Sequence, residues 1–213
     1  MKNAFHIFLI TLIIAGLLLG CSSKNITSVD NSKPSVLAEP LEQALKLPDD
    51  KLIDKFCAGV DLCLGDSLLF DNGKDISSET LFTFFCYITS SQEYGQDYQN
   101  KWENKADNNY RVPVADIKEI LNRYFDGINF DSTQVDGYQA QTEEIVIGGL
   151  GGFGGGRFPE LIKKEQLNND TLKLTVDYYD DQYKTVFYTK AYTIRFTANG
   201  YQYLAIKKVF AKE

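Results

Sequence analysis

Apolar positions at helical spacing dominate the first half of the chain. Beyond residue 40 they fall three and four apart as far as Cys63, with one interruption at Leu47-Pro48-Asp49. Proline disfavours a continuing helix and suits the start of the next, so a short helical lead-in is predicted, followed by a helix from Asp49. The apolar residues that define this pattern are Leu41, Leu45, Leu52, Ile53, Phe56 and Val60.

Two further helices are predicted before residue 127. Ser77 follows a turn at residues 70–74 and belongs to a residue type that caps helices. Pro113 suits the first turn of a third helix, which ends at Asp126-Gly127. The two apolar faces consist of Leu81, Phe82, Phe85, Tyr87 and Ile88, and of Ile117, Ile120, Leu121, Tyr124 and Phe125.

The apolar period changes to two in the last quarter of the chain. Apolar and polar residues alternate over 172–178 and again over 186–196, where Lys190 is the one exception among the apolar positions. Asn199-Gly200 is a strong hairpin signal and leads into a strand over 201–210. Residues 138–147 and 160–167 are plausible earlier strands. The second half is therefore predicted to be an antiparallel meander.

Helices followed by strands indicate an α+β fold, with N-terminal helices packed on a curved antiparallel β-sheet. The order and size of these elements over residues 49–210 resemble the nuclear transport factor-like folds and, more loosely, the cystatin-like folds. That resemblance implies a cone-shaped domain with helices lying in the hollow of a bent sheet. We expect a single domain over residues 40–213.

The N-terminal residues have the parts of a secretion signal. Lys2 gives a basic start, the apolar core runs over residues 8–19, and Gly20 precedes Cys21. The core is shorter than the about 20 apolar residues that cross a bilayer, so cleavage is favoured over a permanent span. An ordinary secretory signal or an uncleaved anchor that happens to contain a cysteine is the alternative.

The order Leu18-Leu19-Gly20-Cys21 resembles the lipobox of bacterial lipoproteins. This resemblance implies a signal peptide over residues 1–20, a diacylglycerol thioether on Cys21, and a mature chain tethered to the membrane outside the cytoplasm. The stretch Tyr110-Arg111-Val112-Pro113, with the glycine run and Tyr-rich strands after it, also resembles lipoproteins of low-GC Gram-positive bacteria. In a Gram-negative host, Ser22 would be compatible with the outer membrane.

Residues 21–39 have the composition of a flexible linker that holds the domain away from the membrane. The formal net charge of the whole chain is −7, and removal of the signal, which carries Lys2 and no acid, makes it more negative. No basic stripe is present, so nucleic acid is excluded as an expected partner. The expected partners are the membrane, through the lipid on Cys21, and an envelope ligand or protein.

Histidine chemistry is excluded from the mature chain, because the only histidine, His6, lies in the signal. A histidine general base, a His-containing triad and the usual zinc or copper ligand are thereby lost. Asp61, Asp66 and Asp71 do not have EF-hand spacing, and no nucleophile elbow is present. We predict no metal and no cofactor.

Aromatic residues supply the candidate binding positions. Tyr94, Tyr98 and Trp102 recur every four residues, and on a helix they would stack along one side. They either cover the edge of the core or form an exposed stripe for sugar or peptide contact. The glycine run over 148–156 lacks the context of a phosphate loop and is interpreted as a connection between strands. Phe153 would anchor a partner if that run accepted one.

The mature chain contains three cysteines besides Cys21, and all three are flanked by apolar residues. Cys57 and Cys63 are too far apart on a continuous helix for a disulfide. Buried, unreactive thiols are favoured, and a bridge from Cys86 to one of the others is the alternative.

Two classes of function remain open at this point. The favoured one is a noncatalytic, membrane-anchored lipoprotein that binds a ligand or a protein. The alternative is an enzyme of histidine-free chemistry whose carboxylates, such as Asp177 or Asp180, converge in the cone-shaped hollow. The direction in which these acids point distinguishes the two.

Overall fold

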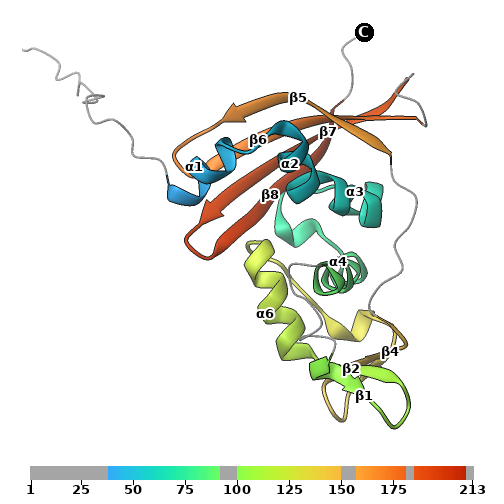
Figure 1. Cartoon of the computed structure of the whole chain (residues 1–213). Helices are drawn as coiled ribbons and strands as arrows, with labels where there is room; N and C mark the ends of the chain where they lie inside the picture. The colour runs from blue at the N-terminus through green and yellow to red at the C-terminus, as the bar shows by residue number, and fades with distance from the viewer. Residues whose placement is uncertain (1–37, 92–99, 150–156, 181–184, 210–213) are drawn as a thin grey trace, which may run out of the picture. The chain divides into compact units, whose positions relative to one another are not determined.

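The computed structural model describes residues 38–91, 100–149, 157–180 and 185–209. The chain divides into two units, residues 1–34 and 35–213, and all of the described residues belong to the second. This unit has an α+β fold with two four-stranded antiparallel sheets, so the predicted fold class is confirmed (Figure 1). One sheet was predicted, and this number is wrong because the unit contains a second, smaller sheet.

The predicted helices are all found. The lead-in is α1 (Glu39–Leu45), and the helix after Pro48 runs without a break through α2 (Asp49–Ile53), a π-helical turn (Asp54–Ala58) and α3 (Gly59–Leu64). Ser77 caps α4 (Ser78–Ser90), because its side chain accepts a hydrogen bond from the Thr80 amide. Pro113 precedes α6 (Val114–Tyr124). Short 3₁₀ turns are formed by Gly65–Leu68, Gly73–Asp75 and Ser132–Gln134.

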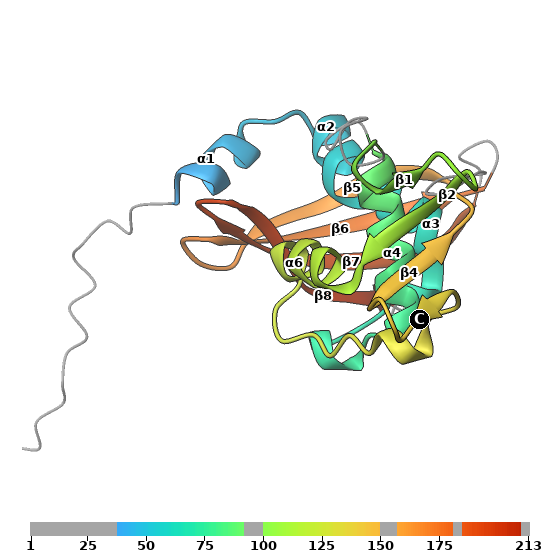
Figure 2. The same ribbon diagram turned by 90° about the horizontal axis from the view of Figure 1, so that it is seen from below.

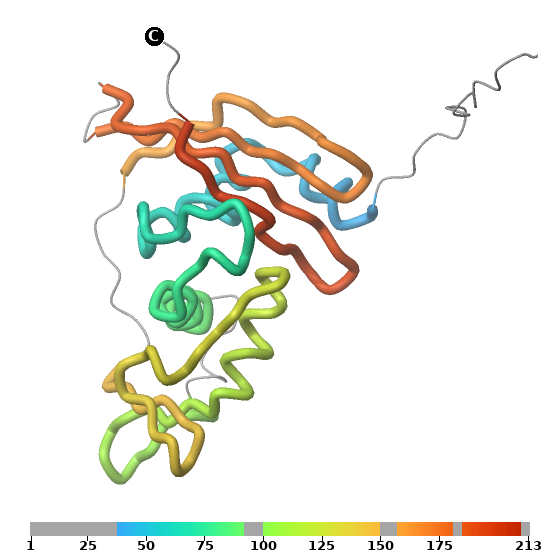
Figure 3. The backbone as a smooth tube through the Cα atoms, turned by 180° about the vertical axis from the view of Figure 1, so that it is seen from behind, coloured from blue at the N-terminus to red at the C-terminus, as the bar shows by residue number. Residues whose placement is uncertain are grey.

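The predicted meander is the larger sheet. Its strands, in both chain and sheet order, are β5 (Phe158–Gln166), β6 (Thr171–Tyr179), β7 (Val186–Thr197) and β8 (Gly200–Val209). The turn before Gly200 is confirmed, and its φ of 135° is one that side chains rarely adopt. The isolated bridges Phe70↔Ile206 and Phe125↔Tyr203 pair two positions on the outer side of β8. Figure 3 shows the larger sheet from behind, with β8 in red.

The smaller sheet was not predicted. It consists of β1 (Glu103–Asn104), β2 (Asn109–Pro113), β3 (Tyr138–Gln139) and β4 (Glu144–Ile147), in the order β1-β2-β4-β3. The strand predicted over 138–147 is a hairpin of β3 and β4. Gly137 is essential to its packing, since a Cβ there would lie 2.2 Å from the Val146 carbonyl oxygen. Helix α6 contacts both β2 and β8 and so links the two sheets (Figure 2).

β5 is the edge strand at the other side of the larger sheet, and no described strand pairs with its outer side. Pro159 removes one backbone donor from this strand, and the pairing with β6 shifts register between Leu161 and Lys163. The bulge leaves the Ile162 side chain exposed, and Lys163 and Lys164 follow it. Proline, bulges and lysines are the features by which natural edge strands resist pairing with further strands.

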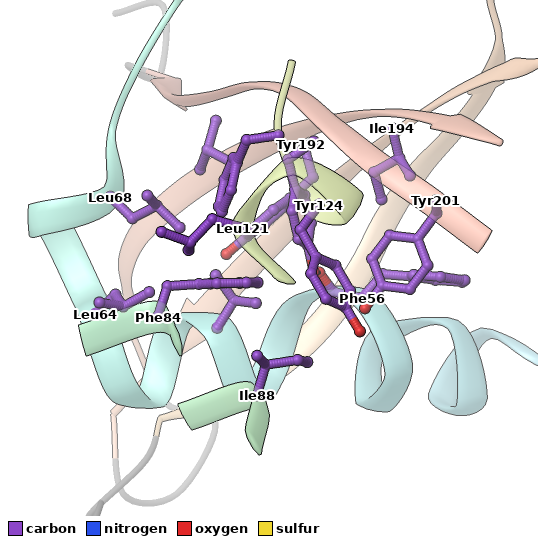
Figure 4. Packing of buried hydrophobic residues seen from close by; sticks show 14 of the residues in the cluster. Phe56, Leu64, Leu68, Phe84, Ile88, Leu121, Tyr124, Tyr192, Ile194 and Tyr201 are labelled. Atoms are coloured by element: carbon purple, nitrogen blue, oxygen red, sulfur yellow. The ribbon is translucent and has the colours of Figure 1, made fainter. Parts of the chain in front are cut away.

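The core lies between the helices and one face of the larger sheet. Tyr192, Ile194 and Tyr201 from this face pack with Phe56 of the π-helical turn and Phe84 of α4 (Figure 4). The rings meet edge to face, as between Phe56 and Tyr201, whose centroids are 4.9 Å apart. Among the described residues, no buried side-chain nitrogen or oxygen lacks a hydrogen-bond partner.

Candidate functional site

Lys190 lies on the core face of β7, with Val176 of β6 and Lys208 of β8 as its cross-strand neighbours. Only 1% of the residue is exposed, although lysine is rarely buried in this way. The sequence signal for this position is the polar exception in the alternating pattern of β7. Sequence reasoning identified the exception without finding its partners.

The ammonium group of Lys190 meets the C-terminal end of the helix over residues 49–64. Its Nζ donates to Asp61 Oδ1 and to the Gly65 carbonyl oxygen, both at 2.7 Å, and lies 3.5 Å from Asp66 Oδ1. Gly65 has a φ of +47°, which turns the chain out of the helix at this point. A cation is favoured here because the last carbonyl groups and the helix dipole both present negative charge.

Asp61 is shared between two donors. Its Oδ2 accepts a 2.6 Å hydrogen bond from the hydroxyl of Tyr188, while its Oδ1 accepts from Lys190. Only 4% of the Asp61 side chain is exposed. Burial, together with the hydrogen bond to Asp61, raises the pKa of Tyr188, so this hydroxyl remains a donor at neutral pH.

A second ion pair, between Lys208 and Asp66, lies on the solvent side of Lys190 and Asp61. Lys208 donates to Asp66 Oδ2, and that hydrogen bond is the main reason why the pKa of Asp66 lies below its ordinary value. Two lysines therefore face two aspartates, and their charges balance. We call this group the Lys190 cluster; its members are Asp61, Gly65, Asp66, Tyr188, Lys190 and Lys208.

Apolar groups and hydroxyls surround the inner side of the Lys190 cluster. The hydroxyls of Tyr178 and Tyr192 lie 2.6 Å apart, and both rings are buried. Burial raises the pKa of the Cys57 thiol well above its ordinary value, with the Asp61 charge as a second cause. The Lys190–Asp61 pair is thus buried, with aromatic rings and a neutral thiol on its inner side.

Exposed apolar side chains gather where β5 and β7 begin and β6 and β8 end. The register places Phe158 opposite Tyr179, and Tyr179 opposite Val186. Phe187 is 62% exposed, and the Arg157 guanidinium lies 4.0 Å from its ring centre, a cation–π contact. We call this surface the aromatic sheet end; its members are Arg157, Phe158, Val186, Phe187 and Val209.

Surface clefts are also found elsewhere among the described residues, and two of them adjoin the larger sheet. One, of about 200 Å³, is formed by α1, the π-helical turn and the β7–β8 hairpin, with Phe56, Phe196 and Tyr201 among its walls. The other, between α2 and β5, is lined by four carboxylates and by apolar groups. Neither contains a member of the Lys190 cluster. The carboxylates of the second are Asp49, Asp50, Asp54 and Glu160.

The residues predicted to bind ligand are placed as follows. Trp102 is buried, at 3% exposure, and its indole N–H donates to Asp116 Oδ2 at 2.8 Å. Trp102 therefore packs against the core, which is the first of the two alternatives predicted for these aromatic residues. It does not form part of an exposed aromatic stripe. The other predicted positions, Cys21, Tyr94, Tyr98 and Phe153, lie outside the described residues.

Asp177, one of the two carboxylates predicted for an enzyme, does not point into the core. Asp177 lies on the opposite face of β6 from the buried Val176 and Tyr178, and it accepts a hydrogen bond from Thr189. The acid that does enter the core is Asp61, which is fully engaged. In the described ranges, no three His, Cys, Asp or Glu residues are placed to hold a metal ion.

The cysteines match the favoured prediction. Cys57, Cys63 and Cys86 are free thiols, with Cys57 buried and the other two partly buried.

Within the described part of the chain, no helix is both long enough and apolar enough to cross a membrane.

Comparisons with protein families, with curated proteins and with solved structures found no match to this chain. The resemblances to the nuclear transport factor-like and cystatin-like folds, and to bacterial lipoproteins, therefore stay predictions.

Proposed function

We propose that this chain is a lipid-anchored, extracytoplasmic lipoprotein whose domain binds a protein partner without catalysis. The anchor is the thioether lipid on Cys21, and residues 21–39 form the tether. The binding surface is the aromatic sheet end, where the partner covers the Phe187 ring and the Arg157 guanidinium that lies over it.

The observation that carries this proposal is the exposure of Phe187. A phenylalanine side chain left mostly in water forgoes about 1.5–3 kcal/mol of burial free energy. At this end of the sheet it is joined by three further exposed apolar residues. Aromatic side chains and arginine are enriched at protein interfaces, where they supply much of the binding free energy.

The interior supports a noncatalytic function. Lys190 and Asp61 are buried and hydrogen-bonded to each other and to protein groups, so neither side chain is exposed to a substrate. Asp177, one of the acids predicted to converge, lies on the opposite face of β6. A binding surface on the exterior is therefore favoured over a reaction site inside.

The anchor is tested by fractionation of cells that produce the full chain or its Cys21→Ser variant. We expect incorporation of labelled fatty acid and membrane association for the full chain, and neither for the variant. Equal membrane association of the two chains, without label in either, would contradict lipidation of Cys21.

The surface is tested by placing a photo-crosslinking amino acid at position 187 in whole cells. Position 167 is the matched control, because Leu167 is 53% exposed and lies just past the opposite end of β5. We expect a discrete protein adduct at position 187 and none at 167. The same adducts at both positions, or none at either, would contradict a binding surface at the aromatic sheet end.

A further inference from the structure

We propose that Lys190 and Asp61 become joined by an intramolecular isopeptide bond, a covalent amide between β7 and α3. The reacting groups are already in contact, since Nζ and Oδ1 lie 2.7 Å apart. Both side chains are more than nine-tenths buried, and they are 129 residues apart in sequence. This contact is therefore fixed by the fold and shielded from solvent.

The reaction balances without an oxidant, a reductant or a cofactor. Transfer of one proton from the Lys190 ammonium to the Asp61 carboxylate gives an amine and a carboxylic acid. The nitrogen lone pair then attacks Asp61 Cγ, a C–N bond forms, and one C–O bond breaks. The departing oxygen carries away two of the three ammonium protons as water, and the third remains on the amide nitrogen. The two opposite charges disappear together.

Burial sets the direction of this reaction. In water, the solvation of the two ions stabilises the free ammonium and carboxylate against the amide. Inside the protein, both ions lose that solvation, which costs several kcal/mol for each buried ion. The neutral amide carries no such cost and keeps hydrogen-bonding groups of its own. Burial of the pair also limits the access of the water that the reverse hydrolysis needs.

The two neighbours of the pair have the chemistry that the steps require. The Tyr188 hydroxyl donates to Asp61 Oδ2, where it polarises the carboxyl group and stabilises the negative charge that develops on that oxygen during attack. Asp66 Oδ1 lies 3.5 Å from Lys190 Nζ and can accept a proton from the nitrogen and return it to the leaving oxygen. The Asp66 side chain is half exposed, which provides a route for the departing water.

The test is a peptide map of the full chain, purified in its native state and then unfolded and digested with trypsin. An unlinked chain yields residues 56–74 as one peptide and is cleaved after Lys190. A linked chain yields one branched peptide of residues 56–74 and 185–195, lighter by one water than the two parts. Fragmentation of that peptide assigns the bond to Asp61, as opposed to Asp66 or Asp71.

The map also separates this bond from other losses of water. An Asp-Gly succinimide would lie at Asp126-Gly127 or Asp136-Gly137, in other peptides, and hydroxylamine would open it. The native protein is incubated at neutral pH for a prolonged time before digestion. If only unlinked peptides are recovered, the proposal is overturned, and Lys190 and Asp61 form an ion pair without a covalent bond. Because this measurement uses the unchanged chain, it holds even if the variants below do not fold.

Variants assign the roles. Lys190→Met and Asp61→Leu abolish the branched peptide, whereas Lys207→Met, the loss of an exposed β8 lysine that pairs with Asp71 outside the Lys190 cluster, retains it. Asp66→Asn and Tyr188→Phe slow its formation in refolded protein, measured as the linked fraction over time. A branched peptide that survives Lys190→Met would overturn the assignment.

Discussion

The hydroxyl of Tyr203 on β8 donates a 3.0 Å hydrogen bond to the carbonyl oxygen of Phe56, inside the π-helical turn. A π turn displaces carbonyl groups from the regular α-helical ladder, and a buried carbonyl without a partner is costly. Tyr203 supplies that partner from the sheet. The irregular turn of the first long helix is therefore matched to one side chain of the last strand.

Tyr203→Phe is expected to lower the free energy of unfolding by about 1–2 kcal/mol, because it leaves the buried Phe56 carbonyl without its donor. Urea denaturation followed by circular dichroism measures the change. Tyr138→Phe, on β3 of the smaller sheet, is the matched control and should change stability by less than about 0.5 kcal/mol. Equal effects of the two variants would show that the hydrogen bond contributes nothing.

Gly59→Ala is expected to destabilise the protein by about 1–3 kcal/mol, despite the better helix propensity of alanine, because the added methyl collides with the partly buried Tyr87 side chain. A Cβ at this position would lie 1.9 Å from the Tyr87 hydroxyl oxygen. Gly149→Ala is the control, since nothing lies within 4 Å of the position that a Cβ would take there. Thermal unfolding compares them. In a Tyr87→Leu background the Gly59→Ala penalty should disappear, and its persistence there would contradict the steric explanation.

Acid is expected to destabilise the protein in part through Asp116. Burial raises the pKa of this carboxyl, but hydrogen bonds from Lys101 and Trp102 and the Lys101 charge outweigh burial, and the pKa falls below 3.8. The unfolded chain then binds the proton more readily than the folded one. The stabilisation is complete well above pH 3.8 and is lost as the pH falls through the folded pKa.

Trp102 is the only tryptophan in the chain, so its fluorescence reports unfolding next to Asp116 directly. The free energy of unfolding of Asp116→Asn should fall less steeply with acidification than that of the unchanged chain. Identical slopes between about pH 5 and pH 3 would contradict this assignment.

The thiols are expected to react slowly while the protein is folded. Burial raises the pKa of Cys63 and of Cys86 from 9.0 to about 12. At pH 8 their thiolate fraction is then roughly a thousandfold smaller than that of an ordinary thiol. In a Cys21→Ser chain, a thiol-specific chromophore should label three cysteines rapidly in urea and only slowly without it. Rapid labelling of native protein would show that burial does not protect these groups.

Long periodic segments could be predicted from the sequence, and short paired segments could not. The helices after Pro48, Ser77 and Pro113 were predicted because a cap or a proline coincides with a sustained apolar face. Strand β2 alternates over only four residues before Pro113, and β1 has two residues, so the smaller sheet depends on tertiary pairing.

The same limit applies to the candidate site. Lys190 is conspicuous in the sequence because it interrupts an apolar face, but Asp61 lies 129 residues away. Nothing local distinguishes Asp61 from the other acids between residues 49 and 75. The π-helical turn is equally hidden, because its partner Tyr203 has the pattern of an ordinary strand tyrosine.

The protected edge of β5 has a consequence for neighbouring copies of the chain. In the proposed lipid-anchored form, the molecules diffuse in the plane of the membrane, where their sheets meet more often than those of proteins free in solution. An edge with a proline, a bulge at Ile162 and paired lysines offers no continuous row of donors and acceptors to a second sheet. If the protein is anchored as proposed, crowding on the membrane would bring these molecules together without strand pairing between their sheets.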